Sequence, residues 1–183
     1  FPFYYAQIAP YDYPILKESN YRNSALMREA QRLIEPQLKN SGMIVLSDVG
    51  DSACIHPGDK KTVGERFAIM AMTRTYGVKT INMNSPKYKS FEIKGSEVEI
   101  SFDDAPNGLS TFGLPLTDFE IAGADSVFHP AVARISAAKV VVSSPEVQKP
   151  VIVRYAFKDY IKGALKGVNG MPVSSFSTLN KIN

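Results

Sequence analysis

Cysteine is almost missing from this sequence, and its scarcity excludes two kinds of site. Cys54 is the single cysteine among 183 residues, so the chain can form neither an intrachain disulfide nor a cysteine-rich metal site. Histidine is nearly as scarce. His56 and His129 lie far apart and lack the close spacing of paired zinc ligands, so a zinc site is not expected either.

Long apolar runs and clusters of one charge are missing too. No run reaches the ~20 apolar residues that a helix needs to cross a bilayer. The opening FPFYYAQIAP lacks the basic region and cleavage site of a signal peptide. The net charge is +3, but Lys and Arg are scattered and form no basic stripe of the kind that binds nucleic acid. We therefore expect no membrane span and no nucleic-acid partner.

Strands and helices alternate in the first half of the sequence. The overall composition, 44% hydrophobic and 21% charged, is that of a globular protein with one large or two small domains. The apolar runs Phe3–Ala9 and Met43–Leu46 predict two buried strands. Each run is followed by a loop and then by a stretch with helical spacing, so the first half is expected to be α/β.

Two helices are predicted beside these strands. Asn23 or Ser24 can cap the first helix, and Pro36 ends or kinks it. The sequence TVGE has capping-box spacing, so Thr62 is expected to start the second helix, and Gly77 is a natural stop for it. The predicted apolar faces are Leu26, Ala30 and Leu33 on the first helix, and Val63, Phe67, Met70, Ala71 and Arg74 on the second.

After Pro86, apolar residues no longer recur at helical spacing but at every second position. Alternating residues fill short runs separated by clusters of Gly, Pro, Asn and Asp, which predicts an antiparallel sandwich-like domain. The expected domains are therefore residues 1–86, α/β, and residues 87–183, all-β. The alternating residues are Phe91, Ile93, Val98, Ile100, Phe102, Val151, Val153, Tyr155 and Phe157.

The α/β half is expected to be the last part of a larger domain. Two strands and two helices cannot cover both faces of a parallel sheet, which needs several β-α-β units. The sequence also starts without Met, on a residue next to a predicted core strand. We therefore expect further strands upstream of Phe1. An open sheet edge should associate with that N-terminal half or with another copy of the chain.

His56 is the main candidate for chemistry. It follows a predicted strand and precedes a predicted helix, at the strand end where open α/β sheets place their sites. A histidine with a carboxylate partner can serve as the base for a nucleophile, and Asp48 and Asp51 are close in sequence. Ser52 lies in a Gly-Asp-Ser sequence like that of some esterase nucleophiles, but it is too near His56 in the chain for the usual arrangement. The alternative for His56 is a capping or loop residue, and His129 is interpreted as a surface or turn residue.

Several segments resemble, in order, the sialate O-acetylesterases, which are carbohydrate esterases of the SGNH (GDSL-like) hydrolase superfamily. The segments include YAQIAPYDY, SALMREAQRL, SDVGD, IHPGDKKTVGERFA and LTDFEIAGADSVFHPA. The resemblance covers nearly the whole chain, and the Ile-His-Pro-x-x-Lys block leading into Val-Gly-Glu-Arg is its most specific part.

The resemblance implies roles for particular residues. His56 matches the catalytic histidine of the family, and residues 1–86 match the last part of the SGNH catalytic domain. The family serine belongs to a Gly-Gln-Ser-Asn block that does not occur here, so the nucleophile would come from an N-terminal part, and Gly-Asp-Ser at Ser52 would be a coincidence. Many members have the partner Asp where this chain has Ala53. Asp51 is therefore the favoured partner, with Asp48 as the alternative.

The resemblance also implies a function. The chain would be the C-terminal part of a carbohydrate O-acetylesterase that uses Ser-His-Asp chemistry on acetylated sugars, with no metal or organic cofactor, in the periplasm or outside the cell. The chain alone would be inactive. The alternative is a non-catalytic carbohydrate-binding or scaffold chain. Whether the sugar is a sialate or a xylan stays open.

Overall fold

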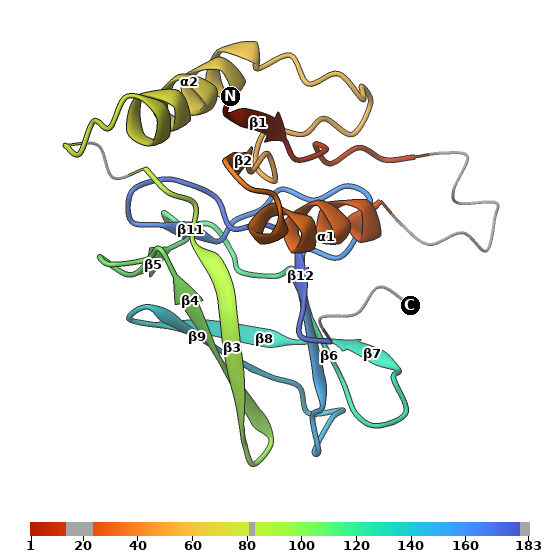
Figure 1. The fold of residues 1–183 in the computed structure, drawn as a ribbon. Helices are drawn as coiled ribbons and strands as arrows, with labels where there is room; N and C mark the ends of the chain where they lie inside the picture. Colours follow the sequence, from red (N-terminus) through yellow and green to blue (C-terminus); the bar gives the residue numbers. More distant parts are fainter. Residues whose placement is uncertain (14–23, 81–82, 180–183) are drawn as a thin grey trace.

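The two α-helices of the described structure lie in the first half of the chain, and the second half is built of short antiparallel strands joined by loops. The structure is a computed structural model and describes residues 1–13, 24–80 and 83–179 (Figure 1). No helix in these ranges is long and apolar enough to cross a membrane.

A short parallel pair of strands organises the first half. β1 (Phe3–Ala6) runs beside β2 (Ser41–Ile44), with Phe3 opposite Ser41 and Ala6 opposite Ile44. Both strands were expected to extend further along the chain. The apolar runs do stay largely buried beyond the paired residues, through Ala9 and Leu46. An apolar run indicates burial, and here burial continues after the ladder ends.

α1 (Ala25–Ile34) buries a face that the apolar pattern did not predict. Leu26 is only half-buried, whereas Arg28 and Glu29 are almost fully buried. The expected face is therefore wrong, because this helix packs its polar side against the β half, where both charged side chains find partners. Ser24 precedes the helix, but its side chain makes no capping hydrogen bond. Asn23 lies outside the described residues. The helix ends before Pro36, in a short 3-10 turn, η2 (Glu35–Gln37).

α2 (Lys60–Met70) starts earlier than the sequence suggested. Its N-cap is Asp59, whose carboxylate accepts a 3.0 Å hydrogen bond from the backbone N–H of Thr62, so the expected start at Thr62 is wrong. One face is as expected: Val63, Phe67 and Met70 pack on a small buried cluster of Ala9, Ile44 and Leu46. A π-helical turn, η3 (Ala71–Thr75), follows. The chain then leaves through Gly77 at φ 70°, which confirms that glycine as the stop.

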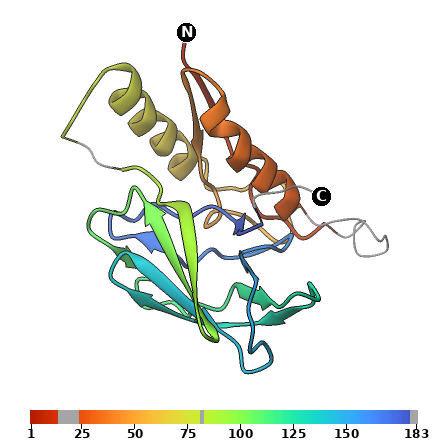
Figure 2. The same cartoon turned by 60° about the horizontal axis from the view of Figure 1, so that its bottom comes forward.

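Figures 1 and 2 show α1 and α2 on opposite sides of the β1–β2 pair. The β half lies beyond α1 and contains two four-stranded antiparallel sheets. The first sheet has the order β3 (Lys87–Lys94), β4 (Glu97–Asp103), β9 (Lys139–Ser143) and β8 (Val132–Ser136). The second has the order β12 (Phe176–Ser177), β10 (Ile152–Tyr155), β6 (Phe119–Ala122) and β7 (Phe128–Pro130). A small pair, β5 (Leu109–Ser110) and β11 (Lys166–Gly167), accompanies them.

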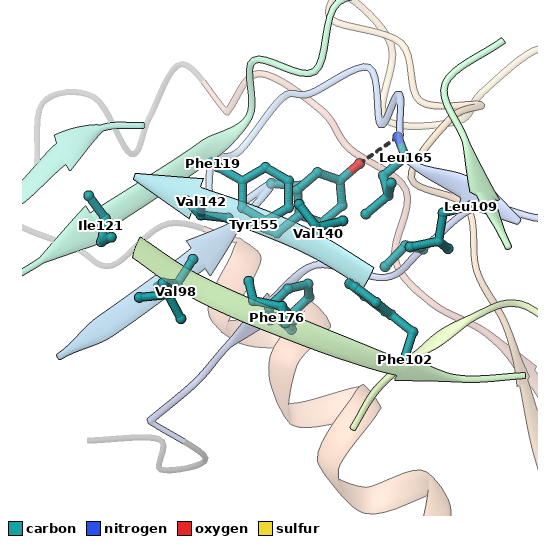
Figure 3. Close-up of a cluster of buried hydrophobic side chains, with 14 of the residues drawn as sticks. Val98, Phe102, Leu109, Phe119, Ile121, Val140, Val142, Tyr155, Leu165 and Phe176 are labelled. Atoms are coloured by element: carbon teal, nitrogen blue, oxygen red, sulfur yellow. Dashed lines mark hydrogen bonds between the residues drawn. The ribbon is translucent and has the colours of Figure 1, made fainter. Parts of the chain in front are cut away.

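The main core lies between these two sheets, as the period of two predicted (Figure 3). Phe119, Tyr155 and Phe176 form its aromatic centre, with Tyr155 and Phe176 5.8 Å apart between ring centroids. Phe91 and Ile93, by contrast, are exposed. Both lie on β3, an edge strand, opposite Ile100 and Val98 of β4, so they share the face of these core residues but stay exposed at the margin of the sheet. The alternating core residues are Val98, Ile100 and Phe102 on β4, Val140 and Val142 on β9, and Ile121 on β6.

Polar contacts join the two halves. Arg28 is fully buried and donates to the side chain of Ser175 at 2.9 Å and to the backbone carbonyls of Ala156, Lys158 and Asp159. Burial lowers the pKa of Arg28 to about 10, although the charge of Asp159 opposes this. β3 begins directly after the expected boundary at Pro86. The division into two domains stays a prediction, because the halves share this buried contact.

Candidate functional site

The loops that follow β1 and β2 lie together, at the carboxyl ends of the two parallel strands. Gly50 is so close to Pro10 that a Cβ atom at Gly50 would lie 2.3 Å from the Pro10 carbonyl oxygen. Only glycine fits this approach. The sequence Asp-Val-Gly-Asp can therefore pass the β1 loop and carry the next residues, up to His56, to the same end of the strands.

Asp48 is the first carboxylate of this loop, and it is held by cations. Its two oxygens each accept a 2.8 Å hydrogen bond from Arg66 of α2, and Lys166 of β11 adds another at 2.7 Å. Burial alone would raise the pKa of Asp48, but the hydrogen bonds and charges of Arg66 and Lys166 outweigh it and hold the pKa below its ordinary value. Asp48 is therefore an ionised link between the two halves.

Asp51 is exposed and shapes the loop. Its Oδ1 atom accepts hydrogen bonds from the backbone N–H groups of Ala53, at 2.7 Å, and Cys54, at 3.3 Å. This is the local turn that an aspartate side chain can stabilise. The carboxylate of Asp51, unlike that of Asp48, faces no cation among the described residues.

His56 lies on the surface, three residues before the N-cap of α2. The neighbouring Pro57 is buried, and Asp59 fixes the first turn of the helix, so the backbone on the C-terminal side of His56 is anchored. In the described part of the chain, no hydrogen bond joins the His56 ring to Asp48, Asp51 or Ser52. The structure thus brings the predicted residues into one loop without connecting the His56 ring to the others, and their catalytic roles stay predictions.

The other sequence candidates lie in different surroundings. Ser52 is exposed in a bend beside Asp51. His129 is on β7, in the β half, and its Nδ1 atom is 2.8 Å from Glu146, a partner that the sequence analysis did not identify. Across residues 1–13, 24–80 and 83–179, no three His, Cys, Asp or Glu side chains are grouped so as to hold a metal ion.

The β half contributes residues to this end of the strands that sequence reasoning missed. Gly163 donates its backbone N–H to the Ser47 carbonyl at 3.0 Å, and the Ser47 hydroxyl donates to Val173 at 3.0 Å. A Cβ atom at Gly163 would lie 2.8 Å from the Ser47 hydroxyl oxygen. Together with the ion pair between Lys166 and Asp48, these contacts connect the β half to the segment that leads to His56. No local pattern marks them, because each partner is far away in sequence.

Comparison with known proteins is informative at the level of solved structures. No family model and no curated protein matches the chain. Among solved structures, the chain is similar to a carbohydrate acetylesterase from Xanthomonas citri, with 34% sequence identity and a TM-score of 0.86. The match covers 97% of this chain and 41% of that protein. The chain therefore spans about two fifths of this structural neighbour, and the fold described above is similar to that of part of it.

Proposed function

We propose that this chain is the C-terminal part of a carbohydrate O-acetylesterase of the SGNH type, similar to the sialate O-acetylesterases. The observation that carries the proposal is the match to the acetylesterase from Xanthomonas citri over 97% of the chain at 34% identity. That level of identity, together with the shared fold, supports shared chemistry better than a shared fold alone, since one fold can carry many functions.

His56 is the general base and Asp51 its partner in this proposal. A serine from the N-terminal part of the protein attacks the acetyl carbonyl carbon, and its proton passes to the His56 imidazole. The bond from the acetyl carbon to the sugar oxygen then breaks, and the imidazolium returns the proton to the leaving sugar hydroxyl. Water hydrolyses the acetyl-enzyme by the same route, which releases acetate and the free serine. This sequence needs no metal and no organic cofactor.

The contacts of the two aspartates favour Asp51 over Asp48 as the partner of His56. Both carboxylate oxygens of Asp48 are engaged by Arg66, and Lys166 also contacts one of them. A carboxylate held in this way has little capacity left to orient an imidazole. Asp51 uses one oxygen for the turn at Ala53 and is closer to His56 along the chain. In this proposal, the serine-bearing part of the protein brings the two side chains into contact.

The test is an acetate-release assay on acetylated sugars with two proteins. One is the 183-residue chain, and the other is the protein as encoded, with the sequence upstream of Phe1. The proposal predicts turnover only for the second, carried by a serine of a Gly-Gln-Ser-Asn block. Turnover by the 183-residue chain alone that disappears in Ser52→Ala would overturn the division of the site between two parts of the protein. An encoded protein without esterase activity would instead favour a carbohydrate-binding or scaffold role.

A further inference from the structure

A partly open cavity lies between the two halves, and none of its lining residues belongs to the His56 loop. Its volume is about 200 Å³. On one side are the end of β2, the last turns of α2 and η3, and on the other side is the segment that enters β3. None of residues 47–59 lines it. Ligand sites often form at such junctions, where apolar walls surround a few polar groups.

Glu35 is the central charge on the cavity wall and is shared by two cations. It is 7% exposed. Its carboxylate accepts a 2.9 Å hydrogen bond from Lys87 and lies 3.6 Å from Arg74, and it also accepts the backbone N–H of Met43 at 3.2 Å. One carboxylate between two cations leaves one positive charge without an opposite charge at this wall.

The remaining charged residues of the wall do not supply that missing negative charge. Arg32 is paired with Glu29 at 2.7 Å, and Arg66 is paired with Asp48. Asp103 is an acid on the wall, but it is already paired with Lys89 at 2.7 Å, in an exposed ion pair. The cavity therefore suits a ligand with a single negative charge placed near Lys87 and Arg74.

The uncharged part of the wall indicates what the rest of the ligand is like. Hydroxyl and amide groups alternate there with apolar side chains, and the ring of Tyr88 is fixed by stacking on Phe176, with centroids 4.8 Å apart. Polar groups can bind ligand hydroxyls, while the apolar groups can contact a face of C–H bonds. The polar residues are Asn84, Ser85, Thr73 and Ser174, and the apolar ones include Met43, Ile69, Met70, Met83 and Met171. The hydroxyls of Thr73 and Ser174 already donate to backbone carbonyls, so they can offer a ligand only an acceptor.

We propose that this cavity binds a small hydroxylated carboxylate, of the chemical class of a sugar acid. Arg74 comes from the first half and Lys87 from the β half, so the bound carboxylate would join them as a second bridge beside Glu35. The proposal concerns a site separate from His56 and does not depend on esterase activity. Its failure and the failure of the proposed function can therefore be told apart.

The test is a calorimetric titration of the 183-residue chain with D-glucuronate, with D-glucose as the neutral analogue of similar size. Glucuronate is expected to bind and glucose to bind at least about tenfold more weakly, because a charge-assisted hydrogen bond is lost. Equal affinity for the two sugars, or no binding of glucuronate, would overturn the proposal.

Substitutions on the wall distinguish a charge effect from loss of structure. Lys87→Met should weaken glucuronate binding about tenfold, and Lys87→Arg should retain most of it. Lys94→Met is the matched control, because Lys94 is on the same strand and pairs with Glu99 at 3.0 Å outside the cavity; it should change nothing. Glu35→Gln should tighten binding severalfold, since it removes the competing carboxylate and keeps an acceptor for Met43. Equal losses in Lys87→Met and Lys94→Met, or weaker binding in a folded Glu35→Gln variant, would contradict the charge argument.

Discussion

Lys166 of β11 donates a 2.7 Å hydrogen bond to Asp48, in the loop that carries His56. The pair connects the β half directly to the candidate site. Arg66 of α2 completes the cluster, with its side chain 7% exposed and that of Asp48 11% exposed. The β half therefore holds the start of the loop that carries His56 in place.

Replacing Asp48 by Asn should destabilise the chain by about 3 kcal/mol or more, because two cations lose their partner in a mostly buried place. Urea unfolding at neutral pH, followed by circular dichroism, measures this. The control is Asp103→Asn, whose ion pair with Lys89 is more than half exposed on both sides and should cost less than about 1 kcal/mol. Equal effects of the two substitutions would show that the Asp48 cluster is not buried in solution.

The same cluster predicts how stability depends on pH. The pKa of Asp48 is lower in the folded chain than its ordinary value, so the folded state favours the ionised form. Its contribution is complete above the unfolded-state pKa of about 3.9 and is lost as the pH falls through the lower folded value. The difference in unfolding free energy between the wild type and Asp48→Asn should therefore be constant near neutrality and shrink only in acid. A difference that shrinks between pH values of about 6 and 8 would point to another group.

Gly50→Ala should distort the site loop, because the new Cβ atom would meet the Pro10 carbonyl oxygen at 2.3 Å. Moving that backbone atom should cost about 1–3 kcal/mol, as overpacking does. Gly58→Ala is a matched control in the same loop, with nothing within 4 Å of the added Cβ atom, and should stay within about 0.5 kcal/mol of wild type. Thermal unfolding of both variants tests the close approach of the two loops.

Tyr155→Phe should lower stability by about 1–3 kcal/mol, because it leaves a buried donor without a partner. In the core of the β half, the Tyr155 hydroxyl oxygen accepts a 3.0 Å hydrogen bond from the backbone N–H of Leu165 (Figure 3). Burial raises the pKa of Tyr155, although this hydrogen bond opposes the rise, so the hydroxyl stays protonated at any pH near neutrality. Tyr4→Phe is the control: its hydroxyl pairs with Thr75 in an exposed place. A difference between the two variants below about 0.5 kcal/mol would contradict the buried role.

Alternation of apolar residues was enough to predict the sandwich core from the sequence, since side chains of a strand alternate between faces. Val98, Ile100 and Phe102 are examples, and all three are buried. The face of α1 could not be predicted in this way. Arg28 and Glu29 are buried because Ser175, Ser177 and several carbonyls of the β half accept or donate to them, and those partners are far away in the sequence.

The candidate site likewise has features that the sequence could predict and features that it could not. The position of His56, between a strand and a capped helix, could be predicted from local signals alone. The ion pairs that hold Asp48 could not be predicted in this way, because Lys166 belongs to the other half of the chain. The start of α2 was misplaced for a local reason: Asp59 and Thr62 are both good capping residues, and the structure uses the earlier one.

The two aspartates of the loop should differ in their effect on catalysis by the protein as encoded. Asp51→Asn should lower kcat strongly while changing KM little, because Asp51 is proposed to orient the base and not to contact the sugar. Asp48→Asn should act mainly through stability, and its kcat should recover at low temperature, where the loop is held. If Asp48→Asn were the variant with a lasting loss of kcat and Asp51→Asn were near wild type, Asp48 would be the partner of His56.

The most direct measurement is the rate of acetate release from an acetylated sugar by the encoded protein with His56→Ala. The account predicts a loss of about 10³-fold or more in kcat, as for a residue that acts as general base in a triad, with circular dichroism and thermal unfolding unchanged because the side chain is exposed. His129→Ala, which removes the other histidine of these 183 residues, should leave the rate unchanged. A folded His56→Ala protein with a rate near wild type would contradict the central claim that this loop carries the catalytic base.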